Sequence, residues 1–182
     1  MLALVAVLAL APYRVTNPII RSGRARACFP YDRVVRVLFL DVDGVLNRTG
    51  FKPADSRGLV SWIEPELAAR FARAAAEHGA HIVMCSDWRI GRTLAALREA
   101  LGARGLALHD VTPSACGGGR WREIAAWLAA NDVAAGDAAI VDDAFDMGEL
   151  AHRHVRISPL TGFDDDAAAT LRALFGRPFH SP

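Results

Sequence analysis

The sequence has 182 residues, 52% of them hydrophobic, and a formal net charge of +1. This length suits one domain with a substantial core, and the apolar content excludes an intrinsically disordered chain. The small net charge excludes a global field that would by itself recruit nucleic acid or an anionic membrane. The three cysteines show no CxxC pair and no zinc-ligand spacing, and their odd number favours a reducing compartment.

Residues 2–11 form an apolar run that is too short to span a bilayer. The run has the length of a signal-peptide core, and Ala9-Leu-Ala11 resembles a cleavage site, but no basic residue precedes it and Pro12 follows. The alternatives are an additional strand or helix, or an extension from a misassigned start codon. We expect a cytoplasmic protein without a membrane partner, with secretion as the alternative. Residues 1–33 are then a leader and linker, disordered or signal-like, ahead of one globular domain over residues 34–182.

Strands and helices are predicted to alternate along this domain. Short apolar runs predict the strands, at residues 34–40, 80–85, 106–108, 137–141 and 154–158. Helical spacing of apolar residues, with start signals before it, predicts the helices, at residues 64–78, 93–101, 120–130 and 166–175. The alternation is typical of a mostly parallel sheet with helices on both faces. The expected fold class is therefore a three-layer, Rossmann-like α/β domain.

The most informative stretch is the strand at residues 34–40 and the acids that follow it. Asp41 and Asp43 are separated by one residue, so their side chains lie on the same side of an extended segment. Gly44 then allows a sharp turn. A strand followed by an Asp-Gly turn is common in α/β proteins. Acids at the carboxyl end of such a strand, however, also lie where these folds place their ligands.

Two further strands end in polar side chains. Ser86 follows the second strand, and Asp142 and Asp143 follow the fourth. The carboxyl ends of parallel strands share one edge, so we expect these groups to converge on Asp41. Neighbouring carboxylates raise each other's pKa values unless a cation lies between them, and an all-oxygen site with open positions suits Mg²⁺. Such a site accommodates phosphate oxygens, and a carboxylate can attack phosphorus to form an aspartyl-phosphate.

With these motifs the sequence resembles the haloacid dehalogenase-like (HAD) hydrolase superfamily. The resemblance rests on Leu38-Phe-Leu-Asp41-Val-Asp43-Gly44-Val, Ile82-Val-Met-Cys-Ser86 and Ala139-Ile-Val-Asp142-Asp143. It implies a Mg²⁺-dependent phosphatase in which Asp41 is the nucleophile and Asp43 the general acid/base. It also implies that Ser86 orients the phosphoryl group. The implied metal site comprises Asp41, the backbone carbonyl of Asp43, and one or both of Asp142 and Asp143, with Asp146 as an alternative.

More narrowly, the chain is similar to a small capless subfamily associated with RNA-repair proteins. The motifs that carry this similarity are Asp-Val-Asp-Gly-Val-Leu-Asn47, Ser86-Asp-Trp-Arg89 and Leu160-Thr-Gly162. The residues expected on the substrate side of the cleft are Gly44, Asn47, Asp87, Trp88 and Arg89. For Trp88 and Arg89, packing and capping at the start of the second helix is the alternative role.

One departure from the superfamily pattern concerns its third motif, which normally supplies a lysine. This chain has no lysine after Lys52, and the corresponding helix begins with Arg120 and Arg122. Arginine carries the same charge and can bind phosphate with two donors, although its geometry differs. We expect Arg120 to take the role, because it directly follows the glycine run. The alternatives to a phosphatase are a phosphotransferase and a HAD-like binding domain that has lost turnover.

The spacing of the motifs also predicts an open cleft. Residues 44–63, between the first motif and the first helix, are too few for a folded cap domain. Without a lid that encloses a small ligand, we expect a phosphate on a large substrate, such as a polynucleotide end. The sequence leaves the oligomeric state open, and a neighbouring copy could supply a cap.

Overall fold

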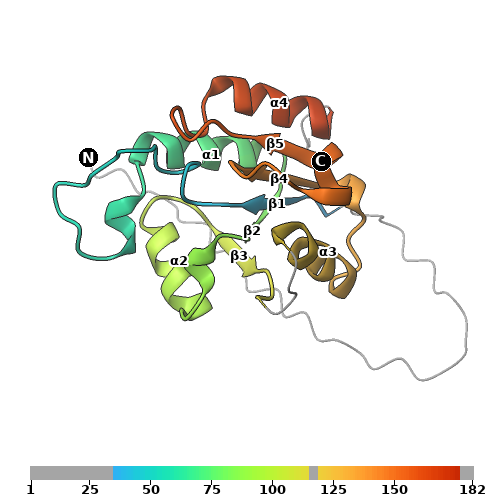
Figure 1. Cartoon of the computed structure of the whole chain (residues 1–182), viewed down its shortest axis with the longest axis horizontal. Helices are drawn as coiled ribbons and strands as arrows, with labels where there is room; N and C mark the ends of the chain where they lie inside the picture. Colours follow the sequence, from blue (N-terminus) through green and yellow to red (C-terminus); the bar gives the residue numbers. More distant parts are fainter. Residues whose placement is uncertain (1–34, 115–118, 177–182) are drawn as a thin grey trace, which may run out of the picture. The chain divides into compact units, whose positions relative to one another are not determined.

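The structure is a computed structural model that describes residues 35–114 and 119–176. Five parallel strands form one sheet in the order β3-β2-β1-β4-β5 (Figure 1). The strands are Val37–Leu40 (β1), His81–Met84 (β2), Leu108–Val111 (β3), Ala138–Asp142 (β4) and His154–Arg156 (β5). The predicted α/β class, with a parallel Rossmann-like sheet, is confirmed. The leader and linker predicted at residues 1–33 lie outside the described residues.

Strand β1 is the central strand, and its position aligns the ends of its neighbours. Phe39 pairs with Val83 of β2 on one side and with Ile140 of β4 on the other. All four residues of β1 are fully buried, as expected for an apolar strand covered on both faces. Because the three strands run in parallel, the residues that follow them emerge at one edge of the sheet.

Helices cover both faces of the sheet, and the two faces follow the alternation of side chains along β1 (Figure 1). Leu38 and Leu40 lie in one apolar cluster with residues of α1 (Pro65–Glu77), α2 (Leu94–Gly102) and α4 (Asp165–Phe175). Val37 and Phe39 lie in the other, with residues of α3 (Arg120–Ala130). None of the helices in the described residues is long and apolar enough to cross a membrane.

Residue types at the helix starts explain where these helices begin. Pro65 occupies the first turn of α1, where its missing N–H leaves no hydrogen bond unmade. Thr93 accepts a hydrogen bond from the Ala96 amide at the start of α2. Asp164 caps α4 in the same way through Ala167, and its carboxylate faces the positive end of that helix.

The third strand differs from the prediction, which placed it at residues 106–108. It spans Leu108–Val111. The Leu106 amide instead donates a hydrogen bond to the Leu101 carbonyl and so closes the end of α2. Four short 3-10 helices were also not predicted: Leu59–Trp62 (η1), Asp87–Arg89 (η2), Ala135–Asp137 (η3) and Gly148–Arg153 (η4). Residues 44–63 contain only η1, so no folded cap lies between β1 and α1.

Candidate active site

Asp41 follows β1 and lies almost completely inside the protein. Its side chain is 6% exposed, and its amide donates a hydrogen bond to the Val141 carbonyl of β4. Burial, and then the charge of Asp142, raise the pKa of Asp41 to about 6, against the lowering effect of Arg120 and of a hydrogen bond from Ser86. The carboxylate therefore lies in a position that favours a further positive charge.

Arg120 is the first residue of α3, and it supplies the positive charge nearest to Asp41. Its Nη1 lies 2.9 Å from Asp41 Oδ2 and 2.6 Å from Asp142 Oδ2. Although burial alone lowers the pKa of Arg120, the two adjacent carboxylates raise it above its usual value. The guanidinium thus remains charged and links the ends of β1 and β4.

Arg122, the alternative to Arg120, lies elsewhere. Its guanidinium carbon stacks 5.0 Å from the centroid of the Trp121 ring. Arg120, in contrast, forms ion pairs with Asp41 and Asp142.

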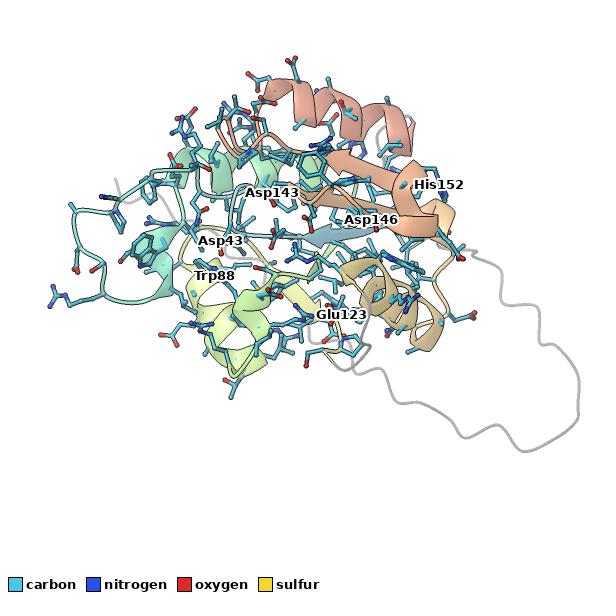
Figure 2. The ribbon with its side chains drawn as sticks, in the orientation of Figure 1. Asp43, Trp88, Glu123, Asp143, Asp146 and His152 are labelled. Carbon is cyan, nitrogen blue, oxygen red and sulfur yellow. The ribbon has the colours of Figure 1, made fainter. Side chains whose placement is uncertain are left out.

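A group of three carboxylates can hold a metal ion. Oxygen atoms of Asp41, Asp142 and Asp143 all lie within 4.8 Å of one another. The donor set consists only of hard oxygen ligands, which fits Mg²⁺. Asp146, the alternative ligand, is exposed and accepts a hydrogen bond from the Gly148 amide instead (Figure 2).

Asp142, the last residue of β4, and Asp143, which follows it, differ in burial and in their hydrogen bonds. Asp142 is fully buried, and its oxygens accept hydrogen bonds from Ala144 and Arg120. Asp143 is partly exposed, and burial followed by the charge of Asp142 raises its pKa. A cation near Asp143 would stabilise its charged form and so offset this rise of its pKa.

Asp43 has an environment unlike that of Asp41. It is exposed, and its two carboxylate oxygens accept hydrogen bonds from Asn47 Nδ2 and Trp88 Nε1, both at 2.9 Å. Figure 2 shows Trp88 beside Asp43. Asn47 Oδ1 also accepts from the Gly44 amide at 3.0 Å, and its amide group donates to the Trp62 carbonyl. Asn47 and Trp88, both predicted on the substrate side, therefore hold Asp43 in place.

Ser86 is buried next to Asp41, where its hydroxyl hydrogen bond lowers the pKa of that carboxyl. Its oxygen also accepts from the Trp88 amide at 3.4 Å, which fixes the start of η2.

Cys85, directly before Ser86, is fully buried and packs in the apolar cluster with residues of α3. Burial raises the pKa of its thiol well above the usual value, which fits a core residue.

Arg89 was predicted on the substrate side, with packing as the alternative. Its side chain is only 3% exposed, and it donates to the carbonyls of Thr112, Cys85 and Ser86. It also forms an ion pair with Glu123 of α3. These contacts show the packing of the structural alternative, but they join η2, the end of β3 and α3 and not the start of α2.

Asp87, in contrast, is exposed and lies 3.9 Å from Arg120 Nη2. Its position at the rim leaves it accessible to solvent, and its contact with a substrate stays a prediction. The structure places all the predicted site residues except Arg89 within this charge cluster or at its rim.

Gly44 separates the loops that follow β1 and β4. Its φ of 76° lies in the left-handed region, and a Cβ atom added here would overlap the carboxylate of Asp143. Glycine is therefore required both by the turn and by the close approach of Asp143.

Two contributions to the site were missed from the sequence. Glu123 holds Arg89 from α3, and the Trp62 carbonyl anchors Asn47. The position of Glu123, three residues after Arg120 on one helix, was a signal that both face the same side. The hydrogen bond to the Trp62 carbonyl could not be predicted, because every residue type has the same backbone carbonyl.

Comparison with known proteins gave one family match. The family model described as "HAD domain in Swiss Army Knife RNA repair proteins" matches residues 37–168, more than two-thirds of the chain. No curated protein and no solved structure matched. The family match supports a hydrolase-type activity, and the acidic cluster fits a metal site. The chain therefore belongs to the family of HAD domains found in Swiss Army Knife RNA repair proteins.

Proposed function

We propose that this domain is a Mg²⁺-dependent phosphomonoesterase that acts through an aspartyl-phosphate on Asp41. The observation that carries the proposal is the contact of one Arg120 nitrogen with both Asp41 and Asp142, inside a cluster of three carboxylates. A lone strand-end aspartate would be a weak candidate. Here a nucleophile, a fixed positive charge and a metal-binding carboxylate pair occupy one edge of the sheet.

The roles of the residues follow from their surroundings. A carboxylate oxygen of Asp41 attacks phosphorus, which forms an O–P bond and breaks the bond to the leaving oxygen. Asp43, held at the rim by Asn47 and Trp88, donates a proton to that oxygen. It then takes a proton from the water that attacks the phosphoryl group, which releases phosphate and restores Asp41. Ser86 and Arg120 hold the phosphoryl oxygens and offset their charge.

The metal ion would be held by Asp41 and Asp143, with Asp142 beside them. When bound, Mg²⁺ supplies Lewis-acid stabilisation of the charge on the phosphoryl oxygens. Asp142 already accepts from Arg120 and Ala144, so its main role is to position Arg120. Asp143, which is more exposed, is the carboxylate free to turn toward a metal.

The proposed substrate carries its phosphate on a large molecule, such as a nucleic-acid end. In the described residues the segment between β1 and α1 contains only the short η1 helix, which supports a cleft without a folded cap domain around a small ligand. The family description, which names RNA repair proteins, supports the same class of substrate.

The test is a phosphatase assay on the full chain with phosphorylated oligonucleotide ends, mononucleotides, sugar phosphates and phosphopeptides. We expect phosphate release that stops with chelator and returns with Mg²⁺, and a kcat/KM that is highest for oligonucleotide ends. Folding is checked by circular dichroism under both conditions. Activity that persists in excess chelator would exclude the metal role, and preference for a small phosphate by the monomer would exclude the open-site argument.

The covalent step has a separate test. With an aryl phosphate labelled in its phosphate, whose leaving group needs no proton from Asp43, the Asp43→Asn protein should accumulate label that hydroxylamine removes, as expected for an acyl phosphate. The Asp41→Asn protein is the matched control and should carry no label. Phosphate release by the wild type with no label on the Asp43→Asn protein would point to direct attack by water. No release by the wild type from any substrate would favour the binding-domain alternative.

A further inference from the structure

Phe145 is the most exposed large apolar side chain in the described parts of the domain, with 84% of its surface accessible. Single exposed apolar residues are common, so exposure alone carries no conclusion. A second observation concerns Arg156, whose guanidinium carbon lies 3.6 Å from the centroid of the Phe145 ring. The arginine covers part of the ring, while the remainder of this flat surface stays open to solvent.

This pair is connected to the carboxylate cluster through strand β4. Phe145 lies two residues after Asp143, and the Ala144 amide between them donates to Asp142 Oδ1 at 2.8 Å. Arg156 is the register partner of Asp142 on the neighbouring strand β5. Asp142 and Phe145 are three residues apart, so their Cα atoms are separated by at most about 11 Å, which keeps the aromatic side chain in the neighbourhood of the carboxylates.

The chemistry of the pair suits an aromatic group with a nearby negative charge. An open ring face stacks on a nucleobase of any sequence, and an arginine on an aromatic ring adds a positive charge near the backbone phosphates. A sugar phosphate has no flat π face to place there. A phosphorylated serine peptide has none next to its phosphate.

We propose that Phe145 and Arg156 form a stacking site for the nucleobase adjacent to the phosphate that is removed. The site would bind the last nucleotide of a single-stranded nucleic acid, with the base on the open face of Phe145 and the phosphate at Asp41. This inference deepens the proposed function and rests on it for the position of the phosphate.

The test compares two ligands that differ only in the terminal base. Short single-stranded oligonucleotides, phosphorylated at either end and labelled at the other, are prepared with a base or an abasic residue next to the phosphate. Their affinities for the full-length Asp41→Asn protein are measured by fluorescence anisotropy at one fixed salt concentration. Removing the base should weaken binding by about fivefold to a hundredfold, the scale for stacking of one base on an aromatic side chain.

Variants of the pair separate stacking from charge and apolar area. In Phe145→Ala the two ligands should bind equally, and Phe145→Leu, which keeps an apolar side chain without a ring, should behave in the same way. Arg156→Ala should weaken both ligands and also reduce the difference between them. The matched controls are Val35→Ala, at the opposite end of β1, and Arg73→Ala, an exposed arginine of α1. Both variants should keep the full difference in affinity between the base-containing and the abasic ligand.

The outcomes distinguish this inference from the proposed function. Equal binding of the two ligands by the parent protein, or an unchanged difference in Phe145→Ala, would overturn the stacking site even if phosphatase activity is present. A clear base dependence that Phe145→Ala abolishes would support the site even if no phosphate is released from any substrate. Tighter binding of phosphopeptides than of base-containing oligonucleotides would overturn it.

Discussion

Asp41 and Asp43 are two residues apart, yet the protein holds them by different means. Asp41 is buried, and a charged guanidinium and a buried hydroxyl compensate its charge. Asp43 is exposed, and neutral amide and indole groups hold it in place. A buried charge without its partner is costly, whereas an exposed carboxylate can exchange a lost donor for water. Removal of the buried guanidinium should therefore affect both folding and activity, and changes at the rim mainly activity.

The largest expected effect is on turnover, from Asp41→Asn. An amide is a very poor nucleophile toward phosphorus, so kcat should fall below detection. The fold should persist, because asparagine has nearly the same shape and carries no charge at a position where burial disfavours charge. Phosphate release and thermal unfolding are measured on protein free of contaminating phosphatase. A rate near that of the wild type would contradict the covalent mechanism.

Arg120→Ala should affect both activity and stability. We expect kcat/KM to fall by about 10²-fold or more, because a partner of the transition-state charge is lost. The free energy of unfolding without metal should fall by about 3 kcal/mol, because two buried carboxyl groups lose the guanidinium with which they are paired. Mg²⁺ should restore part of this stability. Urea unfolding with and without Mg²⁺, together with steady-state kinetics, measures these effects.

Arg122→Ala is the matched control for that prediction, since Arg122 stacks on Trp121 near the start of the same helix. Its effect on both measurements should be far smaller. A larger loss of activity in Arg122→Ala than in Arg120→Ala would assign the lysine-like role to Arg122. No effect of either change on activity would favour a binding domain without turnover.

A smaller effect is expected at the rim, from Trp88→Phe. The change removes the indole N–H that donates to Asp43 but keeps an aromatic ring. We expect kcat to fall by about fivefold, the equivalent of about 1 kcal/mol for one hydrogen bond, with the unfolding midpoint unchanged. Trp62→Phe is the matched control, because the hydrogen bond between Asn47 and Trp62 uses the Trp62 backbone carbonyl. Equal losses in the two variants would show that ring packing matters and that the hydrogen bond does not.

The smallest effect concerns His78, which is buried as Asp41 is but has no hydrogen-bond partner at either ring nitrogen. Burial lowers its pKa below 6.5; Glu77 opposes this shift, and Arg36 and Arg172 add to it. The unfolded chain then binds the proton more readily, so the contribution to stability is complete above pH 6.5 and is lost as the pH falls below it.

Urea unfolding between pH 5 and pH 7.5 tests this assignment. The wild type should lose more stability toward pH 5 than His78→Leu does. His152→Gln, a change at an exposed histidine, should follow the wild type. An identical pH dependence in the wild type and His78→Leu would contradict it.

The sequence was sufficient for the parts of the fold that depend on local patterns. The apolar run before Asp41 and the glycine, proline and threonine signals at helix ends located most elements within a few residues. The third strand was misplaced because Leu106 is apolar and buried whether it belongs to a strand or closes a helix. That choice depends on which backbone groups pair, which residue types do not reveal.

The same distinction applies to the site. Convergence of Asp41, Ser86 and Asp142 follows from the parallel direction of the strands, because parallel strands end at one edge. The role of Arg89 could not be predicted, since a strand-end arginine can face a ligand or turn inward. Its burial depends on the Thr112 carbonyl and on Glu123, which are 23 and 34 residues away.

The contact between Gly44 and Asp143 has a consequence for engineering this domain. The Asp143 side chain lies against Gly44 with space for only a hydrogen atom, so any side chain at position 44 would displace the Asp143 carboxylate from the acidic cluster. Libraries aimed at new substrates should therefore keep position 44 constant and vary exposed outer positions such as Ile90 and Leu160. In such a library the residues around the cleft vary, while the position of the Asp143 carboxylate beside Gly44 stays the same in every variant.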